Sequence, residues 1–158
     1  MTIRSTVFIA VALALTGCAA RYTIPDGAPT ATITLTASDV PQGMTWLSTI
    51  NGHACPQAEI VQLINHKHAN HPHGQARIIA GKTALLRAEM ISFATAGGCA
   101  VNGTFVPAEG GQYEAFFYAA KGVCALQLYR HENRARVVEP TFRQWGRMDE
   151  RQLCSALP

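Results

Sequence analysis

The stretch Thr30–Ala37, TATITLTA, decides the fold, because apolar and hydroxylated residues alternate along it. Ile33 and Leu35 share one side of an extended chain, and the threonines between them share the other. Successive side chains of a β-strand point to opposite faces, so this period of two predicts a strand with one buried face. A short polar stretch containing Pro41 follows and ends it.

The rest of the chain shows further short extended runs, separated by glycine and proline signals. Strands are predicted at residues 44–50, 76–80, 83–95, 99–106, 113–120 and 123–130, with a shorter candidate at 135–139. Residues 56–64, PQAEIVQLI, fit either a strand or one short helix, because so short an apolar run has no decisive period. Residues 65–74 are polar and predict a loop.

Many short strands with little helical pattern predict an all-β fold, a small two-sheet antiparallel sandwich over residues 30–158. The chain has 158 residues, of which 48% are apolar and 15% charged, and this is the composition of one folded domain. The formal net charge of +3 is too small to indicate nucleic-acid binding.

The first twenty residues have the pattern of an export signal. Arg4 is their only charge, and the apolar run at residues 7–15 follows it. As a helix this run covers roughly 15 Å, about half of the hydrocarbon thickness of a bilayer, so it is too short for a permanent span.

The run ends in Leu15-Thr16-Gly17-Cys18, which resembles the lipobox of bacterial lipoproteins. The resemblance implies cleavage before Cys18, removal of residues 1–17 as a signal peptide helix, and attachment of acyl chains to Cys18. Residues 18–29 would then tether the domain to a membrane. Alanines follow the cysteine instead of aspartate, which in enteric lipoproteins favours the outer membrane, with the domain facing the periplasm; the inner membrane stays open.

Four cysteines remain after Cys18, an even number that predicts two disulfides in an exported domain. Three pairings are open, and we favour Cys99–Cys124 and Cys55–Cys154. In one flat sheet, the strands that carry Cys99 and Cys124 would lie about 9.6 Å apart, which exceeds disulfide reach. The first pairing therefore requires a strand switch or a bridge between two sheets.

The mature domain contains the pattern Gly-Lys, an extended segment, Cys, then Phe-x-Pro-x-x-Gly-x-x-Tyr-Glu and a second Cys. Its members are Gly81, Lys82, Cys99, Phe105, Pro107, Gly110 or Gly111, Tyr113, Glu114 and Cys124. In this pattern, much of the mature domain resembles a group of small uncharacterised proteobacterial lipoproteins. The resemblance implies a shared fold and brings no catalytic chemistry.

Four of the six histidines fall within eight residues: His66, His68, His71 and His73. Imidazole suits Zn and Cu, so this segment is a candidate metal site and the basis of an alternative function as a periplasmic metal-binding module. Pro72 prevents one regular strand from presenting all four rings, and a solvated polar loop is the simpler interpretation.

The C-terminal part is rich in arginine, at positions 130, 134, 136, 143, 147 and 151. Guanidinium groups bind carboxylates and phosphates, so peptidoglycan, an anionic glycolipid or an envelope protein are the partners considered, in addition to the membrane through Cys18. An ordinary charged surface is the simpler interpretation. The chain contains neither a G-x-S-x-G nor an H-E-x-x-H motif, and the sequence predicts a structural or interaction role without enzymatic activity or a resident cofactor.

Overall fold

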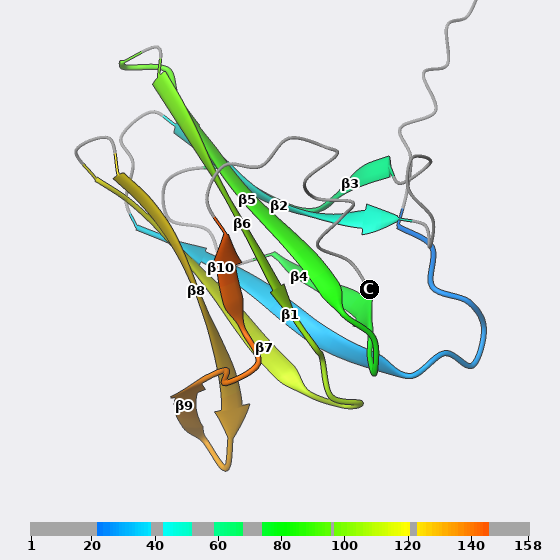
Figure 1. Cartoon of the computed structure of the whole chain (residues 1–158). Helices are drawn as coiled ribbons and strands as arrows, with labels where there is room; N and C mark the ends of the chain where they lie inside the picture. Colours follow the sequence, from blue (N-terminus) through cyan, green and yellow to red (C-terminus); the bar gives the residue numbers. More distant parts are fainter. Residues whose placement is uncertain are drawn as a thin grey trace, which may run out of the picture.

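The computed structural model describes residues 22–38, 43–51, 59–67, 74–95, 97–120 and 123–145. In these ranges the chain forms β-strands and no helix (Figure 1). The strands are β1 (Thr30–Ala37), β2 (Gly43–Asn51), β3 (Glu59–Lys67), β4 (Gln75–Ile79), β5 (Ala84–Ser92), β6 (Gly97–Phe105), β7 (Gln112–Ala120), β8 (Val123–Glu132), β9 (Ala135–Val138) and β10 (Arg143–Trp145).

The strands form two five-stranded sheets, as expected of a sandwich. Sheet A has the order β4-β1-β7-β8-β9, and sheet B has the order β10-β6-β5-β2-β3. Every pairing is antiparallel except β1 with β7, which is parallel. The prediction of a purely antiparallel sandwich is therefore wrong at one strand pair, because residue alternation fixes the buried face of a strand and not the direction of its neighbours.

The apolar faces of the two sheets meet in one core. Ile33 and Leu35 of β1 are fully buried, as their alternation predicts, and the threonines between them are half-buried on the other face. Tyr113 and Phe117 of β7 lie in the same core, where the ring of Tyr113 meets that of Phe105 edge to face. Burying such side chains stabilises a fold by about 1.5–3 kcal/mol each.

Two elements differ from the prediction. Residues 59–67 are a strand, so the ambiguous stretch 56–64 is a strand from residue 59, while residues 56–58 lie outside the described ranges. The predicted polar loop at 65–74 therefore begins too early. Pairing with β2 extends β3 through its polar end, where Lys67 lies opposite Met44. The three-residue β10 was not predicted, since it exists only through its pairing with β6.

On the β6–β8 side, the two sheets are joined covalently. Cys99 of β6 in sheet B is bonded to Cys124 of β8 in sheet A, with a Cα–Cα distance of 6.3 Å. This confirms the predicted pairing and selects a bridge between two sheets. The Leu126 N–H of β8 donates to Gln144 Oε1 of β10 at 2.9 Å, and Gly103 of β6 leaves the space that the Phe142 ring occupies.

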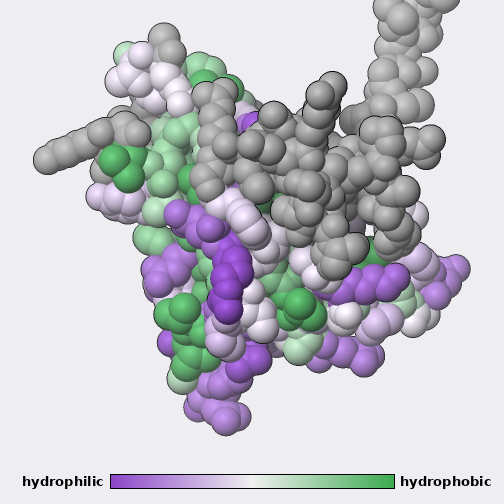
Figure 2. Space-filling view, viewed as in Figure 1, coloured by the Kyte–Doolittle hydropathy of each residue, from purple (hydrophilic) through white to green (hydrophobic). Residues whose placement is uncertain are grey.

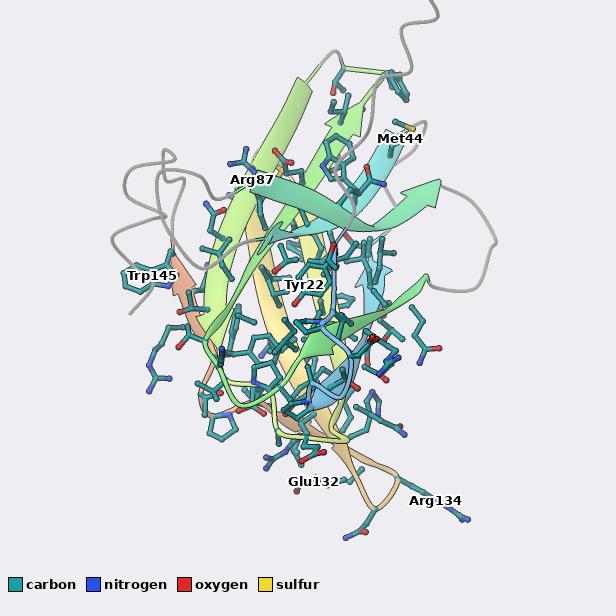
Figure 3. The ribbon with its side chains drawn as sticks, turned by 90° about the vertical axis from the view of Figure 1, so that its right-hand side faces the viewer. Tyr22, Met44, Arg87, Glu132, Arg134 and Trp145 are labelled. Atoms are coloured by element: carbon teal, nitrogen blue, oxygen red, sulfur yellow. A yellow bond between two sulfur atoms is a disulfide. The ribbon has the colours of Figure 1, made fainter. Side chains whose placement is uncertain are left out.

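On the other side of the sandwich, Tyr22 lies between β3 and β4 (Figure 3). Its half-buried ring packs against the core, and its hydroxyl accepts a hydrogen bond of 3.1 Å from the N–H of Ile79. Farther along the same segment, the Ala80 N–H donates to the Pro29 carbonyl. The segment before β1 is therefore held against the domain from Tyr22 onward.

Candidate functional site

The outer face of sheet A carries the candidate site, because register places its polar and aromatic side chains in adjacent rows. Glu114 of β7 lies opposite Tyr129 of β8, and Tyr129 lies opposite Val138 of β9. On the next rows, Phe116 lies opposite Gln127 and His131 lies opposite Arg136. Because every second residue points outward, residues far apart in sequence meet on this face.

Glu114 is the centre of an ion-pair cluster. Arg136 Nε forms a salt bridge with its Oε2 at 3.0 Å, and His131 Nε2 lies 3.5 Å from the same oxygen. The hydroxyl of Thr36 donates to the other oxygen, Oε1, at 2.8 Å. Both carboxylate oxygens thus have polar partners, so Glu114 holds the Arg136 side chain in place and is poorly suited to act as a general base.

Arg136 also stacks on two aromatic rings. Its guanidinium carbon lies 3.7 Å from the centroid of the Tyr129 ring and 5.5 Å from that of Phe116. Cation–π contacts of this kind contribute about 0.5–1 kcal/mol at exposed positions. The side chain of Arg136 is 42% exposed, so a guanidinium held in place by Glu114 and two rings still faces solvent.

The geometry of the cluster leaves a half-exposed guanidinium in a fixed position. A fixed guanidinium binds carboxylate or phosphate with little loss of side-chain entropy. The face continues with the exposed ring of Tyr118 and with the hydroxyl of Tyr129, which donates to Gln127 Oε1 at 2.7 Å. We call Glu114, Phe116, Tyr129, His131 and Arg136 the Arg136 cluster.

The outer face of sheet B holds a second polar group. Glu89 of β5 accepts from Trp46 Nε1 at 2.8 Å and from Arg87 Nη2 at 2.7 Å. The side chains of Arg87 and Glu89 are each only 22% exposed, and Asn102 beside Arg87 in the register is fully buried. This group offers less accessible surface than the Arg136 cluster.

The predicted metal site falls largely outside the described residues. His68, His71 and His73 lie outside them, and His66 belongs to β3 with its side chain not described. Among the side chains that the structure describes, no three histidine, cysteine or acidic residues group as metal ligands. The metal site therefore stays a prediction.

Cys18, the predicted lipidated residue, lies outside the described ranges, as do Cys55 and Cys154, so the anchor and the second disulfide also stay predictions. No helix among the described residues could cross a membrane.

The four described arginines of the C-terminal part have different interaction partners and do not form one cluster. Arg130 pairs with Glu132 and lies 3.9 Å from the buried Glu139, while Arg143 donates to the carbonyl groups of Pro140 and Phe142. Arg134 is exposed in the β8–β9 turn. Arg136 alone among these four stacks on aromatic rings, and sequence reasoning did not distinguish it.

The aromatic residues divide between core and surface by their parity. Tyr113 and Phe117 of β7 lie in the core. Phe116, Tyr118 and Tyr129 instead lie on the outer face. The alternation within Tyr113–Ala120, YEAFFYAA, could have separated the two sets, because Tyr113, Ala115 and Phe117 share one parity.

Comparison with known proteins adds no relative. No protein-family profile, curated protein or solved structure matches this chain.

Proposed function

We propose that the chain is a lipid-anchored protein of the bacterial cell envelope, whose β-sandwich domain acts by binding and not by catalysis. The anchor is the acylated Cys18, and the membrane is the outer membrane with the domain on its periplasmic side. The Arg136 cluster is the binding surface.

The Cys99–Cys124 disulfide is the observation that carries the location outside the cytosol. Disulfides form and persist in oxidising compartments, which include the bacterial periplasm. A chain that begins with a short apolar run and a lipobox-like Leu15–Cys18 stretch reaches that compartment on a membrane surface. Two or more acyl chains on one residue anchor stably, whereas a single chain holds only marginally.

The Arg136 cluster supports binding as the activity. The carboxylate of Glu114 is committed to Arg136, His131 and Thr36, so it serves to orient the guanidinium. An oriented, half-exposed arginine over aromatic rings suits a carboxylate or phosphate carried on a sugar, because the rings add flat apolar contact beside the charge. Peptidoglycan and anionic glycolipids in the envelope present such groups.

Mass spectrometry of the protein purified from bacterial membranes tests the anchor. We expect the N-terminal peptide to begin at Cys18 and to carry acyl chains. A Cys18→Ala variant should lose the acyl mass and leave the membrane fraction. An intact Met1 or a free thiol at position 18 would contradict the proposal.

Binding to isolated peptidoglycan and to lipopolysaccharide tests the surface. We expect Arg136→Ala to reduce retention of the protein about tenfold, which corresponds to the 1.4 kcal/mol of a charge-assisted contact. Arg134→Gln is the matched control, because it removes an equal charge from the exposed β8–β9 turn, away from the aromatic rings. Equal retention of the two variants, or no retention of the wild type, would refute this surface.

A further inference from the structure

Part of the outer face of sheet B is buried, although no described strand packs on it. Leu85 of β5 is 2% exposed and lies outside the core cluster, while Ser48 of β2 and Asn102 of β6 are 2% and 0% exposed. Leu85 belongs to the outer face because Leu86 and Ala88 of the same strand face the core. The outer face of an antiparallel sheet is commonly solvated, so these low exposures indicate a cover.

The cover lies over one half of this face. Leu85, Arg87, Glu89 and Ile91 follow one another along the outer side of β5. Leu85 is 2% exposed, the side chains of Arg87 and Glu89 are each 22% exposed, and Ile91 is 41% exposed. The covered half is therefore the one near the end of β2, which lies beside the beginning of β5.

The C-terminal segment, residues 146–158, begins at the edge of the covered area. β10 pairs with β6, so that Trp145 lies opposite Asn102. Trp145 Nε1 donates to Thr104 Oγ1 at 3.0 Å, and Thr104 lies opposite Leu85 on the outer face. These exposures are those of a single chain, so the cover belongs to the chain itself, and the chain leaves β10 on the side that needs it.

The C-terminal segment, GRMDERQLCSALP, has the length and composition to cross this face. β10 and β2 are three strand spacings apart, about 14 Å, whereas the nine steps from Trp145 to Cys154 can span about 30 Å. Two leucines and a methionine in the segment offer apolar contact to Leu85. The direction agrees with the predicted Cys55–Cys154 disulfide, because Cys55 follows the end of β2 by four positions.

We propose that the C-terminal segment crosses the outer face of sheet B from β10 toward the β2–β3 connection and covers Leu85, Ser48 and Asn102. It then acts as a strap over β6, β5 and β2. The strap closes this face to ligands and leaves the outer face of sheet A, with the Arg136 cluster, as the open face of the sandwich. The lipid anchor plays no part in this arrangement.

Photo-crosslinking in the full-length protein tests the strap. Benzoylphenylalanine is placed at Gln152, and the peptides linked to it are identified by mass spectrometry. We expect links to β5 or β6. The same residue placed at Arg134 is the matched control, because the β8–β9 turn forms the hydrophilic tip at the bottom of Figures 1 and 2, and it should give no link to β5 or β6.

Limited digestion with trypsin gives a second measurement on the unmodified segment. Trypsin cleaves after Arg147 and Arg151, which both belong to the strap. Leu85→Ala removes apolar contact beneath the strap and should raise the rate of these two cleavages about tenfold, because a weakened cover opens more often. Ile91→Ala, at the exposed half of the same strand, is the matched control and should leave the rate unchanged.

Each outcome decides for or against the strap. Links from position 152 that are confined to residues 52–58, to sheet A or to a second copy of the chain overturn it, and so do equal cleavage rates in the two alanine variants. If Leu85→Ala also raises cleavage within the strands, the domain itself is weakened, and the cross-links decide. Retention on peptidoglycan through Arg136 is measured independently, so loss of the strap leaves the proposed function standing.

Discussion

The two sides at which the sheets meet are closed in different ways. On the β6–β8 side, the Cys99–Cys124 bond joins the sheets, and Gln144 adds a hydrogen bond to β8. On the β3–β4 side, closure comes from Tyr22, which belongs to no strand and precedes the whole domain in sequence. One side is therefore stabilised by a covalent bond within the domain, and the other by the segment that leads to the proposed anchor.

This difference would link the proposed anchor to the stability of the core. A force acting on residues 18–21 is transmitted to Tyr22, whose ring packs against the core and whose hydroxyl is bonded to the Ile79 N–H. Within the described ranges, the β6–β8 side has no such connection to the segment before β1. Variants that weaken the disulfide side or the Tyr22 side separately therefore show whether the two sides contribute independently to the free energy of unfolding.

The largest effect is expected from removing the covalent closure. A Cys99→Ala, Cys124→Ala double variant should lose about 3.5 kcal/mol of unfolding free energy, because the bond closes a loop with a sequence separation of 25. Urea unfolding of the oxidised proteins measures this. A loss below about 1 kcal/mol would mean that the hydrogen bond and packing close this side without the bond.

Replacing Tyr22 should have the next largest effect. Tyr22→Ala removes a half-buried ring and a hydrogen bond, and we expect a loss of about 2 kcal/mol in the same measurement. Tyr22→Phe is the matched control; it keeps the ring and leaves the Ile79 N–H without the hydroxyl, so about 1 kcal/mol should be lost. If Tyr22→Ala unfolds like the wild type, residues 22–29 are only a tether.

A smaller effect is expected at Gln144. Gln144→Ala leaves the Leu126 N–H without its side-chain acceptor and should cost about 1 kcal/mol of unfolding free energy. Gln144→Glu keeps an acceptor oxygen at the same position and should retain most of the stability. Equal losses in both variants would assign the role of Gln144 to packing.

The smallest effect is expected from metal ions, which would act on the β3–β4 side because residues 68–74 connect these strands. The proposed function predicts that Zn²⁺ or Cu²⁺ leaves the unfolding midpoint unchanged, as in a variant with His66, His68, His71 and His73 replaced by asparagine. The alternative, a metal-binding module, predicts stabilisation by about 2.7 kcal/mol at a hundredfold excess over Kd. Stabilisation of the wild type alone would favour that alternative.

The alternation of apolar and polar residues predicted those features of the fold that are determined within a single strand. The bounds of β1 agree with the prediction because its apolar residues are buried in strict alternation. The end of β3 and the whole of β10 could not be predicted in this way, since both depend on pairing with a distant strand. The same limit applies to the Arg136 cluster, which exists because register brings Glu114 and Arg136 onto one face.

The parallel pairing of β1 with β7 has a consequence for the order of events during synthesis. The first strand of the domain has Ile33 opposite Tyr113, so its place in sheet A is complete only when some eighty further residues have emerged. Such distant pairing delays folding. A chain threaded through a translocation channel would therefore stay unfolded during passage and assemble its sheets only after arriving on the far side.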